Sequence, residues 1–290
     1  ANYNVAVGMQ ALLANTTGGN NVAMGVSALG SNTTASDNTA IGTSALAANT
    51  TGTENTAVGS LSGDLITTGQ QNTFVGYASG SSGNYSFSTA VGHGALFANT
   101  SGASNTAIGR AALFANTTGT RNVAVGMNAL DANTTANDNT AVGQGSLSEN
   151  TTGGQNTAVG RLSLNVNTTA SNNTAVGFYS LVANTTGAQN TSLGAYSLGN
   201  NLTANDSTAV GYSALYTNAG ASNTAVGSRA MQDNTTGTNS TAVGFNALHA
   251  NTTGAQNVAV GTNALAANTT AQDNTSVGFN SLDANTTGAS

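Results

Sequence analysis

The sequence has no cysteine, proline or tryptophan, and lysine is absent as well. Without cysteine, the fold cannot be held together by disulfides. The four arginines form no cluster and the formal net charge is −6. Nucleic-acid binding and attraction to anionic membranes both depend on clustered positive charge, so the sequence excludes both. No apolar run approaches the length that would insert into a membrane.

Charged residues are also scarce, at 5% of the chain, compared with about a quarter of an ordinary globular domain. Asn, Thr, Ser, Gln and Gly supply the polar surface instead. A composition of this kind is typical of disordered segments unless its apolar residues are regularly placed. Here hydrophobic residues make up 38% of the chain, and their placement is regular.

A glycine preceded by an aliphatic residue recurs every seventeen residues from Gly8 to Gly278. Only the intervals Gly76–Gly92 and Gly211–Gly227 are one residue shorter. The consensus of the repeat is N-T-A-V-G-x-x-A-L-x-A-N-T-T-G-x-x. A fixed period of this kind indicates a repeat architecture in which each unit stacks on its neighbours.

The residues before each repeat glycine alternate with a period of two, which predicts a short β-strand. We expect the β-branched and aliphatic positions of this strand to face the core and the small residue between them, nearly always Ala, to face away. The Leu four residues after the glycine forms a second core column. The predicted core residues are Val7, Leu12, Ile41, Leu46, Val58, Ile108, Leu113, Val125 and Leu130.

The segment between the glycine and the next Asn is ambiguous, because it suits either a second short strand or a single helical turn. We favour the strand. The T-T-G and T-T-A segments that follow predict tight corners. Two Asn columns, exemplified by Asn38 and Asn49, predict side-chain amide ladders along the stack.

These features predict an all-β fold, a parallel β-solenoid (β-roll) of about seventeen 17-residue coils. It forms a single repetitive domain over residues 1–290, with irregular coils over residues 60–91. One coil buries about two aliphatic side chains, worth ~3–6 kcal/mol, which is less than the cost of ordering its backbone. Stability must therefore come from neighbouring coils. Neither end carries a polar cap, which favours a longer parent chain or end-to-end assembly.

The segments Asn38–Gly42 and Asn105–Gly109, which follow the N-T-A-V-G consensus with Ile in place of Val, resemble the head repeats of YadA-type trimeric autotransporter adhesins. The pattern is also similar to N-T-A-V-G repeats in bacterial and phage tail-fibre-like proteins. The resemblance implies a left-handed β-roll, often homotrimeric, on an extracellular fibre or adhesin. It also implies that the Ala column, which includes Ala6, Ala40 and Ala141, lies against neighbouring chains. The repeat here is longer than the adhesin head repeat, so its coil must differ in cross-section.

Few residues are of the types that catalyse reactions or bind metal ions. His93 and His249 lie in distant coils and are expected at the surface. Four acids share one turn column and are best explained as turn-capping residues, namely Asp37, Asp138, Asp206 and Asp273. No nucleophile with a neighbouring base and no phosphate-binding loop is present. We therefore expect a non-catalytic chain without a cofactor or a metal site.

Three features could still mark a binding or modification site. Aromatic residues just after the repeat glycine are candidates for surface contact: Tyr77, Phe178, Tyr179, Tyr212, Phe245 and Phe279. The N-T-T segments are glycosylation sequons if they are exposed, or by-products of an Asn ladder: Asn15, Asn49 and Asn116. The irregular segment Ser60–Ser88 suits a bulging loop or a packing defect, and is the first place to look for a discrete site.

Three functions remain open. The first is a structural subunit of an extracellular fibre or filament, whose partner is another copy of itself in a homotrimer or an end-to-end filament. The second is an adhesive or receptor-binding segment of a tail fibre or surface adhesin, with a cell-surface receptor or glycan as its partner. The third is an ice-binding solenoid that uses its Thr rows. The first two place the chain outside the cell or on a virion fibre.

Overall fold

The structure, a computed structural model, describes residues 3–288. These residues form seventeen strands of three residues each and contain no helix. The strands are β1 (Val5–Val7), β2 (Val22–Met24), β3 (Thr39–Ile41), β4 (Thr56–Val58), β5 (Thr73–Val75), β6 (Thr89–Val91), β7 (Thr106–Ile108), β8 (Val123–Val125), β9 (Thr140–Val142), β10 (Thr157–Val159), β11 (Thr174–Val176), β12 (Thr191–Leu193), β13 (Thr208–Val210), β14 (Thr224–Val226), β15 (Thr241–Val243), β16 (Val258–Val260) and β17 (Thr275–Val277).

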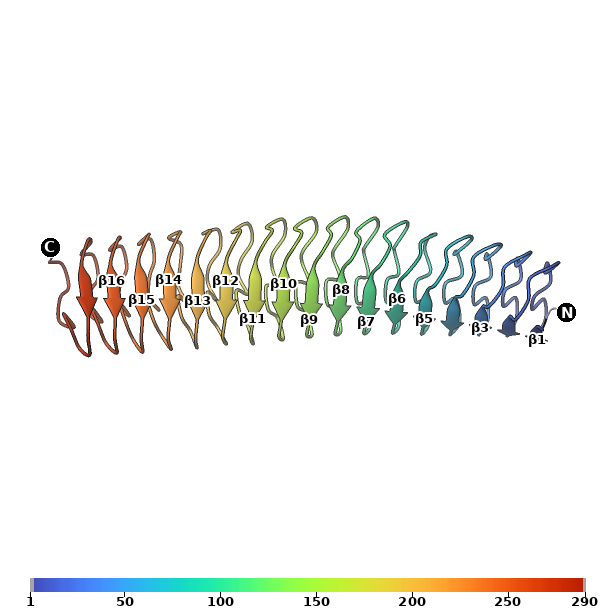
Figure 1. Cartoon of the computed structure of the whole chain (residues 1–290), viewed down its shortest axis with the longest axis horizontal. Helices are drawn as coiled ribbons and strands as arrows, with labels where there is room; N and C mark the ends of the chain where they lie inside the picture. The colour runs from blue at the N-terminus through green and yellow to red at the C-terminus, as the bar shows by residue number, and fades with distance from the viewer. Residues whose placement is uncertain (1–2, 289–290) are drawn as a thin grey trace. The chain divides into compact units, whose positions relative to one another are not determined.

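The chain divides into two units, Ala1–Gln144 with β1 to β9 and Gly145–Ser290 with β10 to β17. Within each unit, consecutive strands pair in parallel and lie side by side, one strand per coil (Figure 1). Equivalent residues are in register, so that Thr39 lies opposite Thr56. The predicted all-β parallel solenoid with a repeat of about seventeen residues is confirmed.

The repeat glycine ends each strand because only glycine fits there. Gly42 has a φ of +133°, a conformation that other residues rarely adopt. A Cβ atom on Gly42 would lie 2.5 Å from the carbonyl oxygen of Gly59 in the next coil. The close approach of stacked backbones therefore explains why glycine recurs in every coil.

The strand alternation is the reverse of the predicted one. The Ala column faces the interior, and both Ala40 and Ala141 are completely buried. The expectation that this column lies against neighbouring chains is therefore wrong. The residues on either side of each Ala point outward, away from the interior of their own coil.

The predicted aliphatic core column is wrong for the same reason. Val7, Ile41 and Ile108 are 55%, 37% and 39% exposed, and Val58 and Val125 are half-buried. Successive side chains of a strand point to opposite faces, and in these three-residue strands the middle side chain points inward and the two flanking ones point outward. The inward space is narrow because the Leu column fills it from the other side, so it accepts Ala and leaves the larger aliphatic residues outside.

The Leu column does form the core. Leu46, Leu113 and Leu130 are completely buried, and Leu12, in the first coil, is half-buried. The segment that carries these residues is not a second strand, contrary to our preference. It consists of two turns, closed by hydrogen bonds such as the one from the backbone N of Asn49 to the carbonyl oxygen of Leu46, at 3.1 Å.

Positive φ angles explain why this segment cannot be extended. Ser44 and Leu46 have φ angles of 57° and 49°, in the left-handed region. A residue of this kind at every second position bends the backbone away from a strand. The backbone instead bonds to neighbouring coils, since Ser44 N donates to Val26 O at 2.8 Å and Leu46 N donates to Ser62 O at 3.0 Å.

Two buried Asn columns complete the interior and confirm the predicted ladders. In the column after the Leu segment, Asn116 Nδ2 donates to Asn99 Oδ1 at 2.7 Å. In the column before each strand, Asn122 N donates to Asn105 Oδ1 at 2.9 Å. The two columns meet at the corner, where Gly119 O accepts from Asn105 Nδ2 at 2.8 Å and from Asn116 Nδ2 at 3.0 Å. The interior is therefore partly polar, with its amides hydrogen-bonded along the stack.

The irregular coils remain in register, because Thr73 pairs with both Thr56 and Thr89. Their interior is repacked. Phe74 replaces the inward Ala, and glycine replaces Leu in the two adjoining turns, at Gly63 and Gly80.

The larger side chain of Phe74 fills the space that the smaller Gly63 and Gly80 leave, so the interior stays packed. A Cβ on Gly63 would lie 2.7 Å from Phe74 Cδ2, which shows that the ring occupies the space of the missing Leu side chain. Tyr85 is buried against Phe74 with ring centroids 5.9 Å apart. Ile66 stands in the Asn column and is also completely buried. The segment is therefore a variant of the core that stays within the solenoid.

Candidate binding surfaces

Residues 3–288 enclose no pocket. They also bring together no group of three or more His, Cys, Asp or Glu side chains that could hold a metal ion. No helix suited to crossing a membrane occurs in this part of the chain. Candidate sites must therefore be sought on the outer surfaces of the coils.

The first candidate is the strand face, which we define as the outward side chains at the first and third positions of each strand. The first position carries Thr or Val, and the third carries an aliphatic residue. None of the seventeen strands contains a charged residue. Because consecutive strands are in register, each unit presents one row of mostly Thr and a parallel row of aliphatic side chains.

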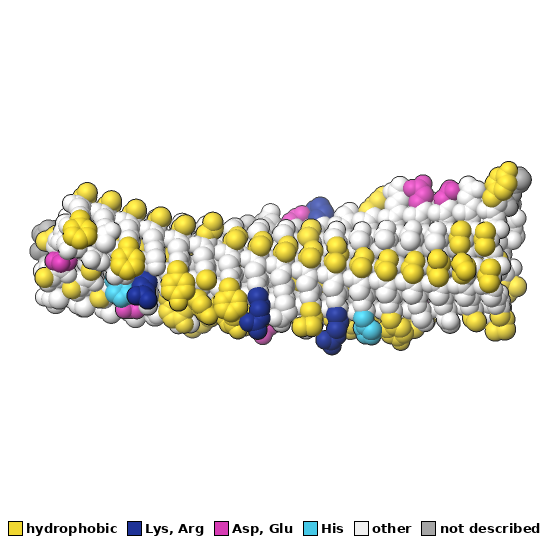
Figure 2. Space-filling view, turned by 90° about the horizontal axis from the view of Figure 1, so that it is seen from below, with side chains coloured by type: hydrophobic (Ala, Val, Ile, Leu, Met, Phe, Trp, Pro, Cys, Tyr) yellow, Lys and Arg dark blue, Asp and Glu magenta, His cyan; other side chains and the backbone are white. Residues whose placement is uncertain are grey.

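The second candidate is the ring ridge, formed by the side chains one, two and five residues after each repeat glycine. The second position of one coil lies beside the fifth position of the next. For example, Asn165, five residues after Gly160, donates a hydrogen bond from Nδ2 to the carbonyl oxygen of Gly145, two residues after Gly143, at 2.9 Å. Most of the exposed rings, with arginine and histidine side chains among them, lie toward the lower border of the view in Figure 2. Of the seven tyrosines and seven phenylalanines, ten occupy these positions: Tyr77, Phe97, Phe114, Phe178, Tyr179, Tyr196, Tyr212, Tyr216, Phe245 and Phe279.

In the first unit, the ridge contains separate pairs of rings. Phe97 and Phe114 stack with centroids 5.1 Å apart and planes inclined by 6°. Tyr77 stacks on His93 with ring centroids 5.2 Å apart, so this exposed histidine has an aromatic neighbour. The predicted contact residue Tyr77 is therefore exposed, but it lies outside any larger cluster of rings.

In the second unit, four rings form a continuous group. We call Phe178, Tyr179, Tyr196 and Tyr212 the aromatic platform. Tyr196 links its members, with centroids 5.5 Å from Phe178, 5.8 Å from Tyr179 and 6.0 Å from Tyr212. The guanidinium carbon of Arg161 lies 5.7 Å from the centre of the Phe178 ring.

Sequence reasoning selected three of these four rings but did not associate Arg161 with them. The sequence did contain a signal for this contact: Arg161 directly follows Gly160, so it occupies the same column as Phe178 in the preceding coil. The other predicted contact residues of this unit, Phe245 and Phe279, are exposed in later coils of the ridge.

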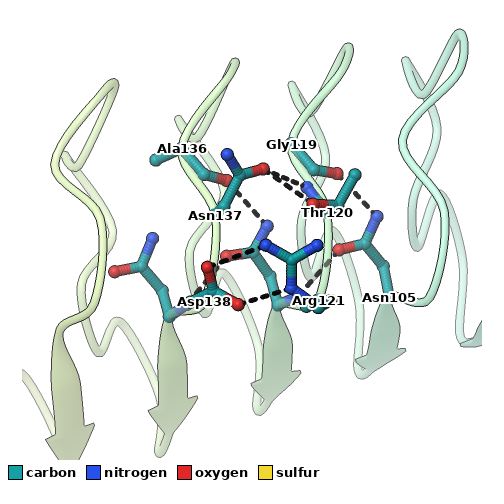
Figure 3. Close-up of polar contacts among 9 residues, drawn as sticks. Asn105, Gly119, Thr120, Arg121, Ala136, Asn137 and Asp138 are labelled. Carbon is teal, nitrogen blue, oxygen red and sulfur yellow. Dashed lines mark hydrogen bonds and ion pairs between the residues drawn. The ribbon is translucent and has the colours of Figure 1, made fainter.

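The turn-column acids lie at an exposed corner and bridge neighbouring coils. Arg121 and Asp138 form a two-point contact, with Nε to Oδ1 at 2.6 Å and Nη2 to Oδ2 at 3.0 Å (Figure 3). The hydrogen bond from Arg121 lowers the pKa of the Asp138 carboxyl below its ordinary value. Beside this pair, Asn137 Oδ1 accepts from Thr120 N at 2.7 Å. The arrangement connects one coil to the next.

Asp37, a second corner acid, and His249 also have contacts between coils. Asp37 accepts a hydrogen bond from Asn20 Nδ2 at 3.0 Å. His249 Nε2 lies 3.8 Å from Asp233 Oδ2, and its Nδ1 is 3.3 Å from Arg229 O. Each of these contacts joins one coil to a neighbouring coil.

The candidate glycosylation sites belong to the interior. Asn49 and Asn116 are completely buried in the ladder, and Asn15 is half-buried with its Nδ2 donating to Gly18 O at 3.1 Å. An enzyme could not reach the Asn49 and Asn116 amides in the folded chain, so the structure contradicts these two sites. The sequons follow from the ladder and from the Thr corner that comes after it.

The sequence was also compared with known proteins. No protein-family model matches it, and the search of curated proteins found no match.

Proposed function

We propose that this chain is a non-catalytic structural subunit of an extracellular fibre or filament, and that its copies associate through their strand faces. The observation that carries the proposal is the outward direction of the aliphatic and Thr rows. A soluble β-strand that is exposed on one face ordinarily presents polar or charged residues there. Here every described strand presents an aliphatic side chain at its third position and no charge at all.

The extent of this surface supports association. Val226 and Val243 are each 37% exposed, and Leu193 is 40% exposed. Repeated over the eight or nine strands of a unit, such rows amount to several hundred Å², on the order of the patches that mark interaction sites. Covering the rows removes apolar surface from water without desolvating any charge.

The geometry favours packing between sheets. Aliphatic rows from two copies can interdigitate at the ~10 Å spacing of stacked sheets, as in dry interfaces between identical segments. Three copies with their strand faces toward a common axis would give the homotrimer that the adhesin resemblance implies. End-to-end assembly would leave the strand face exposed, so the two modes of association can be separated experimentally.

The test is the size of the protein in solution. We expect multi-angle light scattering to give a multimer for the wild-type chain and a monomer for Val226→Asp/Val243→Asp. Thr236→Asp serves as the matched control because Thr236 is exposed at a corner, away from the strand face. It should leave the multimer intact. A wild-type chain that stays monomeric as its concentration rises, or a double variant that still forms the multimer, would refute this proposal.

A second candidate, ice binding, is favoured by the same face. The Thr row of the strands is regular and outward, whereas the first Thr of each corner is engaged, as when Thr50 Oγ1 donates to Thr67 O at 3.1 Å. Thermal hysteresis of the monomeric fraction would distinguish an ice-binding face from an interface between copies.

A further inference from the structure

We infer that the aromatic platform binds a linear oligosaccharide of pyranose sugars, laid along the stacking direction of the coils. This site is separate from the strand face and adds adhesion to the proposed structural role. The inference rests on four neighbouring rings that span three consecutive coils, all of them at outward positions.

The fold does not require these rings. The interior of the same coils is complete without them, since Ala175, Leu181 and Leu198 are completely buried. The position of Phe178 and Tyr212 is taken by Ser228 and Thr262 in later coils. Aromatic side chains at positions that tolerate Ser and Thr are not needed for the core, which favours a role at the surface.

The rings support one another and leave surface for a ligand. Phe178 and Tyr212 are 39% and 51% exposed, and Tyr179 and Tyr196 are half-buried. Tyr179 and Tyr196 stack with planes inclined by 28°. Rings held in contact lose little conformational entropy when a ligand binds, which favours recognition by stacking.

The size and shape of the platform select the ligand class. Four partly exposed rings present about 300–400 Å², well below the ~800 Å² that each partner buries in a stable protein–protein interface. Compact small molecules are usually held in concave pockets, and the described residues form none. An extended ligand that lies across several rings is consistent with both observations.

The chemistry of the platform points to sugars. Pyranose rings present flat C–H faces that stack on Phe and Tyr, and hydroxyl edges that the Tyr hydroxyls can hydrogen-bond. The Tyr196 centroid lies 5.5 Å from that of Phe178 and 6.0 Å from that of Tyr212, and each step is comparable with one sugar residue. Both of these rings are nearly perpendicular to Tyr196, at 85° and 81°, so a sugar chain laid across the platform would meet ring faces and ring edges in turn. Nucleic-acid bases also stack on rings, but the net charge of −6 disfavours a polyphosphate backbone.

The experiment is an array of defined linear oligosaccharides, both neutral and acidic, probed with the full chain and followed by calorimetric titration of the best ligand. We expect Tyr196→Ala to weaken binding at least about fivefold, by analogy with the loss of one stacking ring from a base-binding platform. Tyr196→Phe keeps the ring and should bind within a few-fold of wild type. Phe245→Ala, in the same ridge but in a later coil, is the matched control and should bind like wild type.

The inference is overturned if no oligosaccharide binds above background, or if Tyr196→Ala binds as tightly as Phe245→Ala. Circular dichroism and light scattering of each variant should match wild type, since the platform is separate from the core and from the strand face. A change in multimer size together with intact sugar binding would instead count against the strand-face proposal alone.

Discussion

The buried Asn ladder allows a quantitative prediction at Asn116. Its side chain takes part in three hydrogen bonds: Nδ2 donates to Asn99 Oδ1 at 2.7 Å and to Gly119 O at 3.0 Å, and Oδ1 accepts from Asn133 Nδ2 at 2.7 Å. At roughly 0.5–1.5 kcal/mol each, Asn116→Ala should cost about 2–4 kcal/mol. Two former partners remain bonded, since Gly119 O keeps Asn105 Nδ2 and Asn133 Nδ2 keeps Ala136 O. This limits the loss.

Hydrogen exchange is the appropriate measurement, because a long solenoid need not unfold in a single step and exchange reports stability locally. The predicted cost corresponds to exchange roughly 30-fold to several hundred-fold faster at the backbone amides of residues 99–133. Thr118→Ala is the matched control. Thr118 is exposed in the same corner, and this substitution removes the same Asn116-Thr117-Thr118 sequon without touching the ladder. It should change exchange by no more than about twofold. Equal effects of the two substitutions would refute the ladder as a source of stability.

The remaining predictions concern the variant core and the exposed corner. Phe74→Ala should destabilise its coils by about 3–5 kcal/mol by opening a cavity, and Phe74→Ala/Gly63→Leu should recover part of that loss, as measured by hydrogen exchange of the same coils. If the double variant is less stable than Phe74→Ala, the Phe74 ring does not occupy the space of the missing Leu side chain. The carboxyl of Asp138 should titrate below the ordinary Asp value in an NMR titration, and Arg121→Gln should return it to that value. The contribution of this pair to stability should be present above the unfolded-state pKa and be lost as the pH falls through the lower, folded-state pKa. An Asp138 pKa that Arg121→Gln leaves unchanged would contradict the assigned cause.

Much of the fold could be predicted because periodicity reports stacking directly. The spacing of Gly42 and its equivalents established the coil length, and the two Asn columns indicated ladders that the structure contains. These inferences depend only on like residues lying above one another.

The direction of the strand side chains could not be predicted from alternation alone. A period of two separates two faces but does not say which is inside. Hydrophobicity favoured Ile41 over Ala40 for the interior, yet the interior accepts only a small residue opposite the Leu column. The exchange of Ala for Phe74 together with the loss of Leu at Gly63 and Gly80 was visible in the sequence, and it was the one signal of the correct arrangement.

The second predicted strand failed for a different reason. Leu46 and its equivalents adopt left-handed backbone conformations, which are unfavourable for this residue type in isolation. Burial of the Leu side chain and hydrogen bonds to adjacent coils offset that cost. Local propensity therefore could not reveal the two turns.

For the binding surfaces, the sequence identified the columns that carry exposed rings, but only the structure brought Tyr196 and Arg161 together with Phe178.

The proposal as a whole depends on which strand residues face outward and meet other copies. The absence of native cysteine makes a paired cross-linking measurement direct. Val226 is 37% exposed on the strand face, and the adjacent Ala225 is completely buried. With a short bismaleimide, Val226→Cys should give covalently linked dimers on a denaturing gel, since each chain then has a single thiol, and Ala225→Cys should remain a single chain. Linkage of Ala225→Cys, or an unlinked Val226→Cys at concentrations where the wild type is a multimer, would contradict the account.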